Sequence, residues 1–70
     1  MKNRLEELRT QKGWTQQDLA DRVLVSRQTI NSLERGRYNP SITLGFRLAR
    51  QFAVAIEDIF LYSDEEDNDE

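Results

Sequence analysis

Apolar residues recur at intervals of three and four along most of the chain, which is the spacing of amphipathic helices. Capping residues stand at matching places, so five helices are predicted. Asn3 is placed to cap the first helix and Gly13 to end it in a left-handed conformation. The predicted helices cover residues 4–12, a segment that begins after Thr15, residues 27–35, the segment from Ser41 to Phe52, and residues 56–60.

The second and third helices begin with the same local pattern. The hydroxyl groups of Thr15 and Ser26 can each accept a hydrogen bond from a free backbone N–H, and Asp18 stands where a capping box needs it. An apolar residue precedes each cap and another follows four residues after it, as in a hydrophobic staple. The two predicted staples pair Trp14 with Leu19 and Val25 with Ile30.

The third helix has one apolar side and one hydrogen-bonding side. Its only large apolar residues, Ile30 and Leu33, lie on one face at 100° per residue. The other face carries Arg27, Gln28, Asn31, Ser32 and Arg35. Polar faces are common on solvent-exposed helices, so this pattern alone does not separate a binding surface from a solvated one.

The fourth helix is apolar along one side, and the two chain ends can form a short strand pair. Its apolar stripe consists of Ile42, Gly45, Ala49 and Phe52, with Leu44 and Leu48 beside it. Residues 1–3 and 61–63 are the segments that can pair briefly. The predicted fold class is therefore all-α.

Composition narrows the possible functions. The 70 residues suffice for one small domain, and the chain contains no cysteine and no histidine. This excludes a disulfide, a thiolate or imidazole metal site and a Ser-His-Asp relay. No apolar run approaches the roughly 20 residues of a membrane span. We therefore expect a cytoplasmic protein that is not an enzyme, with no cofactor, no membrane association and no small-molecule ligand.

The negative charge of the chain is concentrated at one end. The formal net charge is −3, but six of the 13 acidic residues lie in residues 64–70. The other seven, against ten basic residues, leave residues 1–63 with a charge of +3. A polar acidic run without aromatic residues cannot bury enough apolar surface to fold. The sequence thus predicts a domain over residues 1–62 and a disordered acidic tail over residues 63–70.

Three segments match a known pattern of two capped helices joined by a turn, namely Thr15–Ala20, Val25–Ile30 and Leu33–Gly36. With them, the chain resembles the lambda repressor and Cro family, also called the XRE family, over about residues 3–62. The Tyr-Asn-Pro-Ser turn and the Glu-Asp-Ile-Phe segment are similar to its small stand-alone regulators. The resemblance implies a five-helix, lambda-repressor-like DNA-binding domain that regulates transcription.

The resemblance also implies which residues contact DNA. In this family the start of the third helix reads base edges in double-stranded DNA, and the matching residues are Arg27, Gln28, Asn31 and Ser32. These types suit the task, because arginine can donate two hydrogen bonds to guanine, and glutamine and asparagine can bond adenine. Gln16 is expected to bond a phosphate and to brace Gln28. The expected phosphate contacts are Gln16, Gln17, Thr29, Arg35, Arg37 and Asn39.

Two further expectations concern structure rather than DNA contact. The family pattern pairs Arg9 with Glu34 as a partly buried ion pair between the first and third helices. The apolar end of the chain either closes the monomer core or forms a two-fold homodimer interface, and we favour the interface. The residues assigned to that interface are Leu44, Leu48, Phe60, Leu61 and Tyr62.

Together these features predict a dimeric repressor that binds a near-palindromic operator with the helix at residues 27–35 in the major groove. Two alternatives within the same fold are an antitoxin and a restriction-modification controller. A third is a protein-interaction adaptor that does not bind DNA.

Two positions depart from the family pattern. Leu24 and Ala53 stand where the family often has glycine, so each turn must avoid a left-handed residue or strain one.

Overall fold

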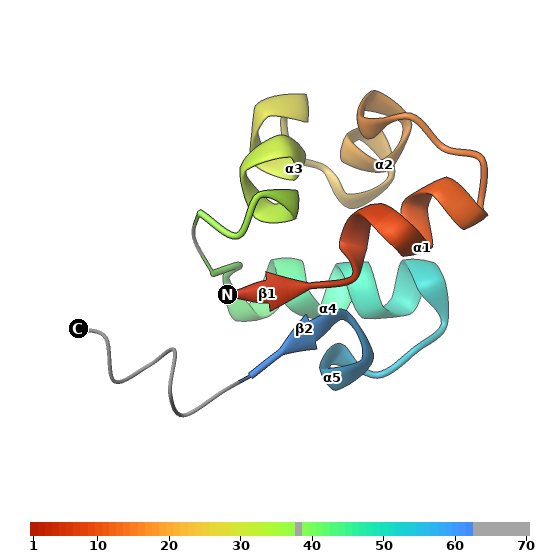
Figure 1. Ribbon diagram of the computed structural model, residues 1–70. Helices are drawn as coiled ribbons and strands as arrows, with labels where there is room; N and C mark the ends of the chain where they lie inside the picture. The colour runs from red at the N-terminus through yellow and green to blue at the C-terminus, as the bar shows by residue number, and fades with distance from the viewer. Residues whose placement is uncertain (38, 63–70) are drawn as a thin grey trace.

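The computed structural model describes residues 1–37 and 39–62, in which five short helices accompany a two-stranded sheet at the chain ends (Figure 1). The five predicted helices are all present, and their bounds differ from the predicted ones by at most one residue. The predicted acidic tail, residues 63–70, lies outside the described residues. The elements are β1 (Lys2–Asn3), α1 (Leu5–Gln11), α2 (Gln16–Val23), α3 (Arg27–Glu34), α4 (Ile42–Phe52), α5 (Ile56–Ile59) and β2 (Phe60–Leu61).

The predicted pairing of the two chain ends is confirmed. β1 and β2 are antiparallel, with Lys2 opposite Leu61 and Asn3 opposite Phe60. Because Phe60 takes an extended conformation to enter β2, α5 ends one residue earlier than predicted. On its other side β1 contacts the end of α3, where the Asn3 amide donates to the Leu33 carbonyl at 2.7 Å. The short sheet therefore links both chain ends to the third helix.

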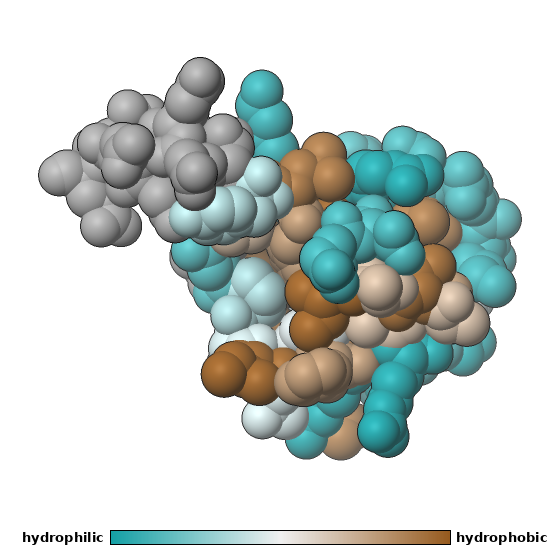
Figure 2. All heavy atoms as spheres, turned by 90° about the horizontal axis from the view of Figure 1, so that it is seen from below, coloured by the Kyte–Doolittle hydropathy of each residue, from teal (hydrophilic) through white to brown (hydrophobic). Residues whose placement is uncertain are grey.

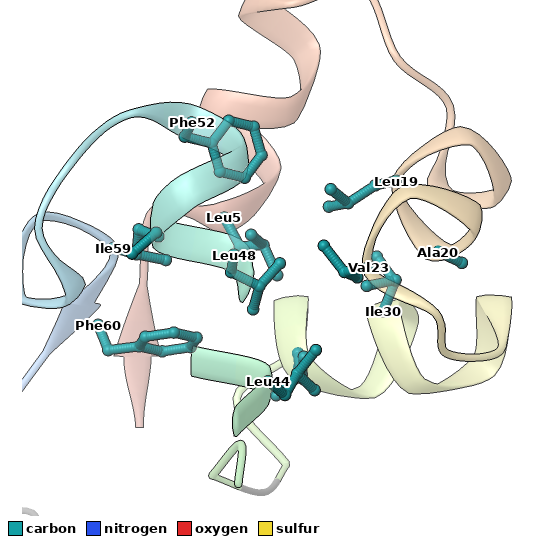
Figure 3. Close-up of a cluster of buried hydrophobic side chains, with 12 residues drawn as sticks. Leu5, Leu19, Ala20, Val23, Ile30, Leu44, Leu48, Phe52, Ile59 and Phe60 are labelled. Carbon is teal, nitrogen blue, oxygen red and sulfur yellow. The ribbon is translucent and has the colours of Figure 1, made fainter. Parts of the chain in front are cut away.

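The hydrophobic core draws residues from every helix. Leu5, Leu19, Ile30, Leu48 and Ile59 are completely buried, and Figure 3 shows side chains of α2, α4 and α5 converging on this centre. Burial of one such side chain is worth about 1.5–3 kcal/mol. This core fixes the position of α3, since Ile30 belongs to it.

The apolar stripe predicted for α4 is buried except at its first residue. Gly45, Ala49 and Phe52 are buried as the stripe predicts, but Ile42 is 79% exposed. Ile42 is the first residue of α4, and its side chain does not reach the core. Leu44 and Leu48, which stand beside the predicted stripe, are buried in the core instead. An apolar residue thus lies on the surface where the sequence pattern had placed it in the stripe.

The predicted caps of α2, α3 and α4 are confirmed, but the predicted Asn3 cap of α1 is not. Arg4 is the N-cap residue of α1 and makes no side-chain cap hydrogen bond, while the Asn3 side-chain oxygen accepts from the Leu5 N–H at 3.0 Å. The hydroxyl oxygens of Thr15, Ser26 and Ser41 accept hydrogen bonds from backbone N–H groups three residues later, at 3.0, 3.2 and 3.1 Å. Asp18 completes the capping box by accepting a hydrogen bond from the Thr15 N–H at 2.9 Å. Ala55 has no capping oxygen, but its N–H donates to the Asp58 carboxylate at 3.0 Å.

Acid should weaken the α2 cap. The hydrogen bond from the Thr15 backbone holds the pKa of Asp18 below its usual value, with help from the Thr15 hydroxyl and Arg22. The ionised carboxylate therefore stabilises the fold above its unfolded pKa of about 3.9, and this contribution is lost as the pH falls through the lower folded value. Thermal melts from pH 5 to pH 2 should show a smaller loss of stability for Asp18→Asn than for the natural chain. Identical pH dependence would contradict the capping role.

Two turns contain left-handed residues that are not glycine. Leu24, after α2, has φ 65°, and Ala53, after α4, has φ 56°. Gly13 and Gly36 end α1 and α3 with φ 75° and 71°, as the sequence predicts. The two positions that depart from the family pattern therefore keep the left-handed conformation, and the backbone there is strained. An L-residue in this conformation costs about 1–2 kcal/mol.

Glycine at either strained position should stabilise the domain. We expect Leu24→Gly and Ala53→Gly each to raise the free energy of unfolding by about 0.5–1 kcal/mol, since relief of strain exceeds the entropy that glycine adds to the unfolded chain. Both side chains are exposed, so little burial is lost. Gly13→Ala is the matched control and should destabilise by about 1 kcal/mol, because its new Cβ meets no atom within 4 Å and only the positive φ is penalised. Urea unfolding measures all three variants, and a loss of stability in both glycine variants would contradict the argument.

Within residues 1–37 and 39–62, the longest helix has 11 residues and none is long and apolar enough to cross a membrane.

Candidate nucleic-acid interface

The third helix is held by the core on one face and open on the other. Ile30 and Leu33 are completely buried, whereas Arg27 and Gln28 are exposed at the start of the helix. Asn31 and Ser32 continue the open face and are half-buried. The structure thus brings the four predicted base-reading residues onto one outward face of a fixed helix.

A network of charged and amide side chains fixes α3 against α1 and α2. The Arg9 guanidinium donates to both Glu34 oxygens, at 2.6 and 3.3 Å, and to the Trp14 carbonyl at 2.8 Å. Only 11% of the Arg9 side chain and 5% of the Glu34 side chain are exposed. The hydrogen bond to Glu34 raises the already high pKa of Arg9. The predicted ion pair between the first and third helices is therefore present and nearly buried.

Gln16 extends this network to the open face of α3. Its amide nitrogen donates to Glu34 at 2.9 Å, and its amide oxygen accepts from Asn31 at 3.5 Å. The expected brace of Gln28 by Gln16 is not the contact found, because the amide of Gln16 lies between Glu34 and Asn31. One predicted phosphate contact and one predicted base contact are thus connected through the protein itself.

The other predicted phosphate contacts lie on α2, in the first turn of α3 and in the segment that follows α3. Gln17 is exposed on α2 and donates to Asp21 at 2.8 Å. The Thr29 hydroxyl lies 3.0 Å from that of Ser26, within the α3 cap. Arg35, Arg37 and Asn39 follow the helix and are all exposed. In the described part of the chain, no carboxylate forms an ion pair with Arg27, Arg35 or Arg37.

Lys2 is a basic residue of this region that the sequence analysis did not include. It is exposed in β1 and lines one surface hollow together with Arg35 and Gly36. The Met1 backbone nitrogen donates to the Gly36 carbonyl at 3.2 Å, which holds β1 beside the end of α3. The predicted strand pair was the only available signal, and it did not indicate that β1 also contacts α3.

The predicted dimer residues do not form one surface. Leu44, Leu48 and Phe60 are 6, 0 and 7% exposed, so these three belong to the monomer core and their assignment to an interface is corrected. They are buried because α4 and β2 close the core below α1 (Figures 1 and 3). Leu61 and Tyr62 are exposed, as an interface would require.

A short turn joins two packed helices, and the second of them presents hydrogen-bonding side chains to solvent from a buried apolar stripe. Free N–H groups at the start of such a helix also favour a phosphate. This arrangement defines a helix-turn-helix DNA-binding domain, in which the second helix fits the major groove.

Comparison with known proteins agrees, and the chain belongs to the helix-turn-helix family, which it matches over residues 5–59. It is 52% identical over 66 residues to an HTH-type transcriptional regulator of Methanocaldococcus jannaschii, covering 94% of this chain and all of that protein. Among solved structures it is similar to the restriction-modification controller protein C.AhdI from Aeromonas hydrophila, with a TM-score of 0.73 and 35% identity over 81% of this chain and 86% of that one. The protein is therefore a DNA-binding transcription regulator.

Proposed function

We propose that the protein binds a near-palindromic operator as a homodimer, with α3 of each copy in the major groove of one half-site. The single observation that carries this proposal is the outward face of α3, whose Arg27 and Gln28 are exposed at the end that enters the groove. Arg27 suits a guanine, while Gln28 and Asn31 suit adenines, and Ser32 accepts either. No catalytic step is part of this function.

The phosphate contacts set the register of the helix on DNA. Arg35, Arg37 and Asn39 lie beyond the end of α3. Gln16 and Gln17 begin α2, where Gln16 reaches Asn31 and Glu34 of α3, so the proposed backbone contacts come from two separate segments beside the recognition helix. Thr29 contributes from the first turn of α3, next to its cap.

A different surface from the predicted one supports dimerisation. An apolar groove between α4 and α5 is lined by Pro40, Ile42, Phe46 and Ile56, which we call the α4–α5 face. Ile42 and Phe46 are 79 and 56% exposed, and Figure 2 shows hydrophobic residues gathered on this side of the molecule. A two-fold axis through this face lets the projecting residues of each copy enter the groove of the other.

Charge complementarity supports a second copy as the occupant. Arg50 and Glu57 line a neighbouring groove that shares Phe46 and Ile56 with the α4–α5 face. Both are exposed, and neither forms an ion pair with another of the described residues. In an isologous dimer, Arg50 of one copy can meet Glu57 of the other, and the contact occurs twice. Leu61 and Tyr62 follow Phe60, which also lines the first groove, and stay part of the proposed interface.

A charge in the α4–α5 face should separate the copies. We expect Phe46→Glu to be monomeric at a concentration where the natural chain is dimeric, with its helical circular dichroism unchanged because Phe46 is outside the core. Light scattering after gel filtration measures the mass. Leu24→Glu is the matched control, since Leu24 is 73% exposed on a different turn. A monomeric natural chain, or a dimeric Phe46→Glu variant, would contradict the interface.

Repression by blocking a promoter, in the cytoplasm where prokaryotic DNA lies, is the mode of action that we propose. The competence pilus inhibition repressor of Acinetobacter baylyi is 39% identical over 62 residues, although the match covers only 56% of that protein. Selection of bound sequences from a random duplex library tests the proposal. We expect two inverted half-sites whose centres lie about 34–36 Å apart. A single half-site without symmetry would contradict the dimeric mode, and no enrichment would contradict operator binding.

A restriction-modification controller is the second candidate, and the similarity to C.AhdI favours it. Genes for an endonuclease and a methyltransferase beside this gene would support that role, and their absence would exclude it.

A further inference from the structure

We propose that the acidic segment, residues 64–70, binds the basic surface at the end of α3 and competes there with DNA phosphates. The inference rests on the proposed DNA-binding surface and adds a regulation of it. The basic surface consists of Lys2, Arg35 and Arg37, which we call the α3-end cluster. All three residues are exposed, and Lys2 and Arg35 line the same hollow.

The chain leaves the two-stranded sheet close to the end of α3. Lys2 pairs with Leu61 in an antiparallel register, so the next residue, Tyr62, comes beside Met1. The Met1 nitrogen is hydrogen-bonded to the Gly36 carbonyl at 3.2 Å. Since neighbouring strands lie about 4.8 Å apart, the backbone at Tyr62 lies roughly 10 Å from that of Gly36. Gly36 stands between Arg35 and Arg37 in the sequence. The acidic segment is thus attached beside the α3-end cluster.

The segment is long enough to reach both ends of α3. Residues 63–70 span at most about 27 Å when fully extended. α3 has eight residues and is about 12 Å long, so its first residue, Arg27, is also within reach. Attachment at this point keeps the carboxylates at an effective concentration on the order of millimolar around the DNA-binding face.

The acidic segment and the α3-end cluster have opposite charges. Residues 64–70 contain six carboxylates in seven positions, whereas residues 1–63 carry a net charge of +3. No carboxylate of the described residues is paired with Arg35 or Arg37, so these cations keep their full attraction for an anion. Phosphates and carboxylates offer the same acceptor oxygens to arginine, and therefore exclude each other from the cluster.

Neutralising the segment tests the proposal on the full chain. The six changes are Asp64→Asn, Glu65→Gln, Glu66→Gln, Asp67→Asn, Asp69→Asn and Glu70→Gln, and we call this chain the neutral-segment variant. It should bind random-sequence duplex about 3- to 10-fold more tightly at 50 mM salt. The difference should fall below about 2-fold at 300 mM, because salt then screens charges that are more than about 6 Å apart. Equal affinities at 50 mM would overturn the proposal.

A charge-matched pair of variants separates this local effect from net charge. Glu65→Gln with Glu66→Gln changes the charge by the same amount as Glu6→Gln with Glu7→Gln, on the exposed surface of α1 and outside the proposed interfaces. The first pair should tighten binding clearly more than the second. Equal gains would show that only net charge matters and would overturn a contact with the cluster.

A measurement without DNA separates this proposal from the proposed function. The Nε–H resonances of Arg35 and Arg37 and the Gly36 amide should shift between the natural chain and the neutral-segment variant, and the difference should vanish at high salt. Resonances of Arg50 should not move. If these shifts occur but neither chain binds any duplex, operator binding fails and the segment contact stands. If both chains bind DNA equally and no resonance shifts, the segment contact alone fails.

Discussion

Substitution of Arg9 by methionine should destabilise the domain by about 3 kcal/mol, which is a large part of the roughly 5 kcal/mol expected for a chain of this size. The reason is that Glu34 stays behind as a nearly buried carboxylate with only the Gln16 amide as donor. The Trp14 carbonyl loses its donor as well. Urea unfolding at 15 °C measures the free energy even if the variant is partly unfolded at higher temperature.

Two comparison variants show whether burial causes the loss. Arg4→Met breaks an exposed pair with Glu7, whose side chains are 43 and 52% exposed, and should cost much less than Arg9→Met because solvent screens the two charges. Arg9→Met combined with Glu34→Leu should regain part of the stability, because no unpaired charge then remains in the interior. Equal small losses for Arg9→Met and Arg4→Met would contradict a structural role for the ion pair.

Two arginines of the proposed DNA-binding face, Arg27 and Arg37, should have different effects on DNA binding when each is changed to alanine. Arg27→Ala should weaken operator binding by about 1–3 kcal/mol and relax the preference at one base pair of each half-site, because Arg27 begins α3, at the end that we propose enters the groove. Arg37→Ala should weaken all duplexes alike and reduce the slope of log affinity against log salt by about one. Fluorescence titration against an operator and a random duplex at several salt concentrations measures both effects.

The charge control for this experiment is Arg4→Ala, which removes one positive charge from the start of α1, outside α3 and the turn that follows it. Arg4→Ala should leave the difference in affinity between operator and random duplex unchanged. If Arg27→Ala and Arg37→Ala lower the two affinities in the same proportion, the division into base and phosphate contacts is wrong.

Features that form between near neighbours in the chain could be predicted from the sequence. The caps at Thr15, Ser26 and Ser41 each join atoms three residues apart, and the left-handed ends at Gly13 and Gly36 depend on one residue. The polar face of α3 follows from helical period alone. The Arg9–Glu34 pair came instead from the family resemblance, because nothing in the local pattern joins residues 25 positions apart.

Features that depend on distant neighbours could not be predicted. Helical spacing indicates that α4 has an apolar side, but it does not say which apolar residues the core reaches. Leu44 and Leu48 were therefore assigned to an interface although the core buries them, whereas Ile42 and Phe46 are exposed. Lys2 was missed for a similar reason, since the contact that brings β1 to α3 joins Met1 with Gly36.

The hydrogen-bond chain from Arg9 through Glu34 and Gln16 to Asn31 has a consequence for how operator preference can diverge among related regulators. Asn31 and Gln16 share their amides with the groups that hold α3 in place, so exchanges at these positions should change stability together with the DNA contacts that we propose for them. Arg27 and Gln28 are exposed and take no part in that chain. New operator preferences should therefore arise at positions 27 and 28 first, while positions 16 and 31 change only with a compensating substitution elsewhere.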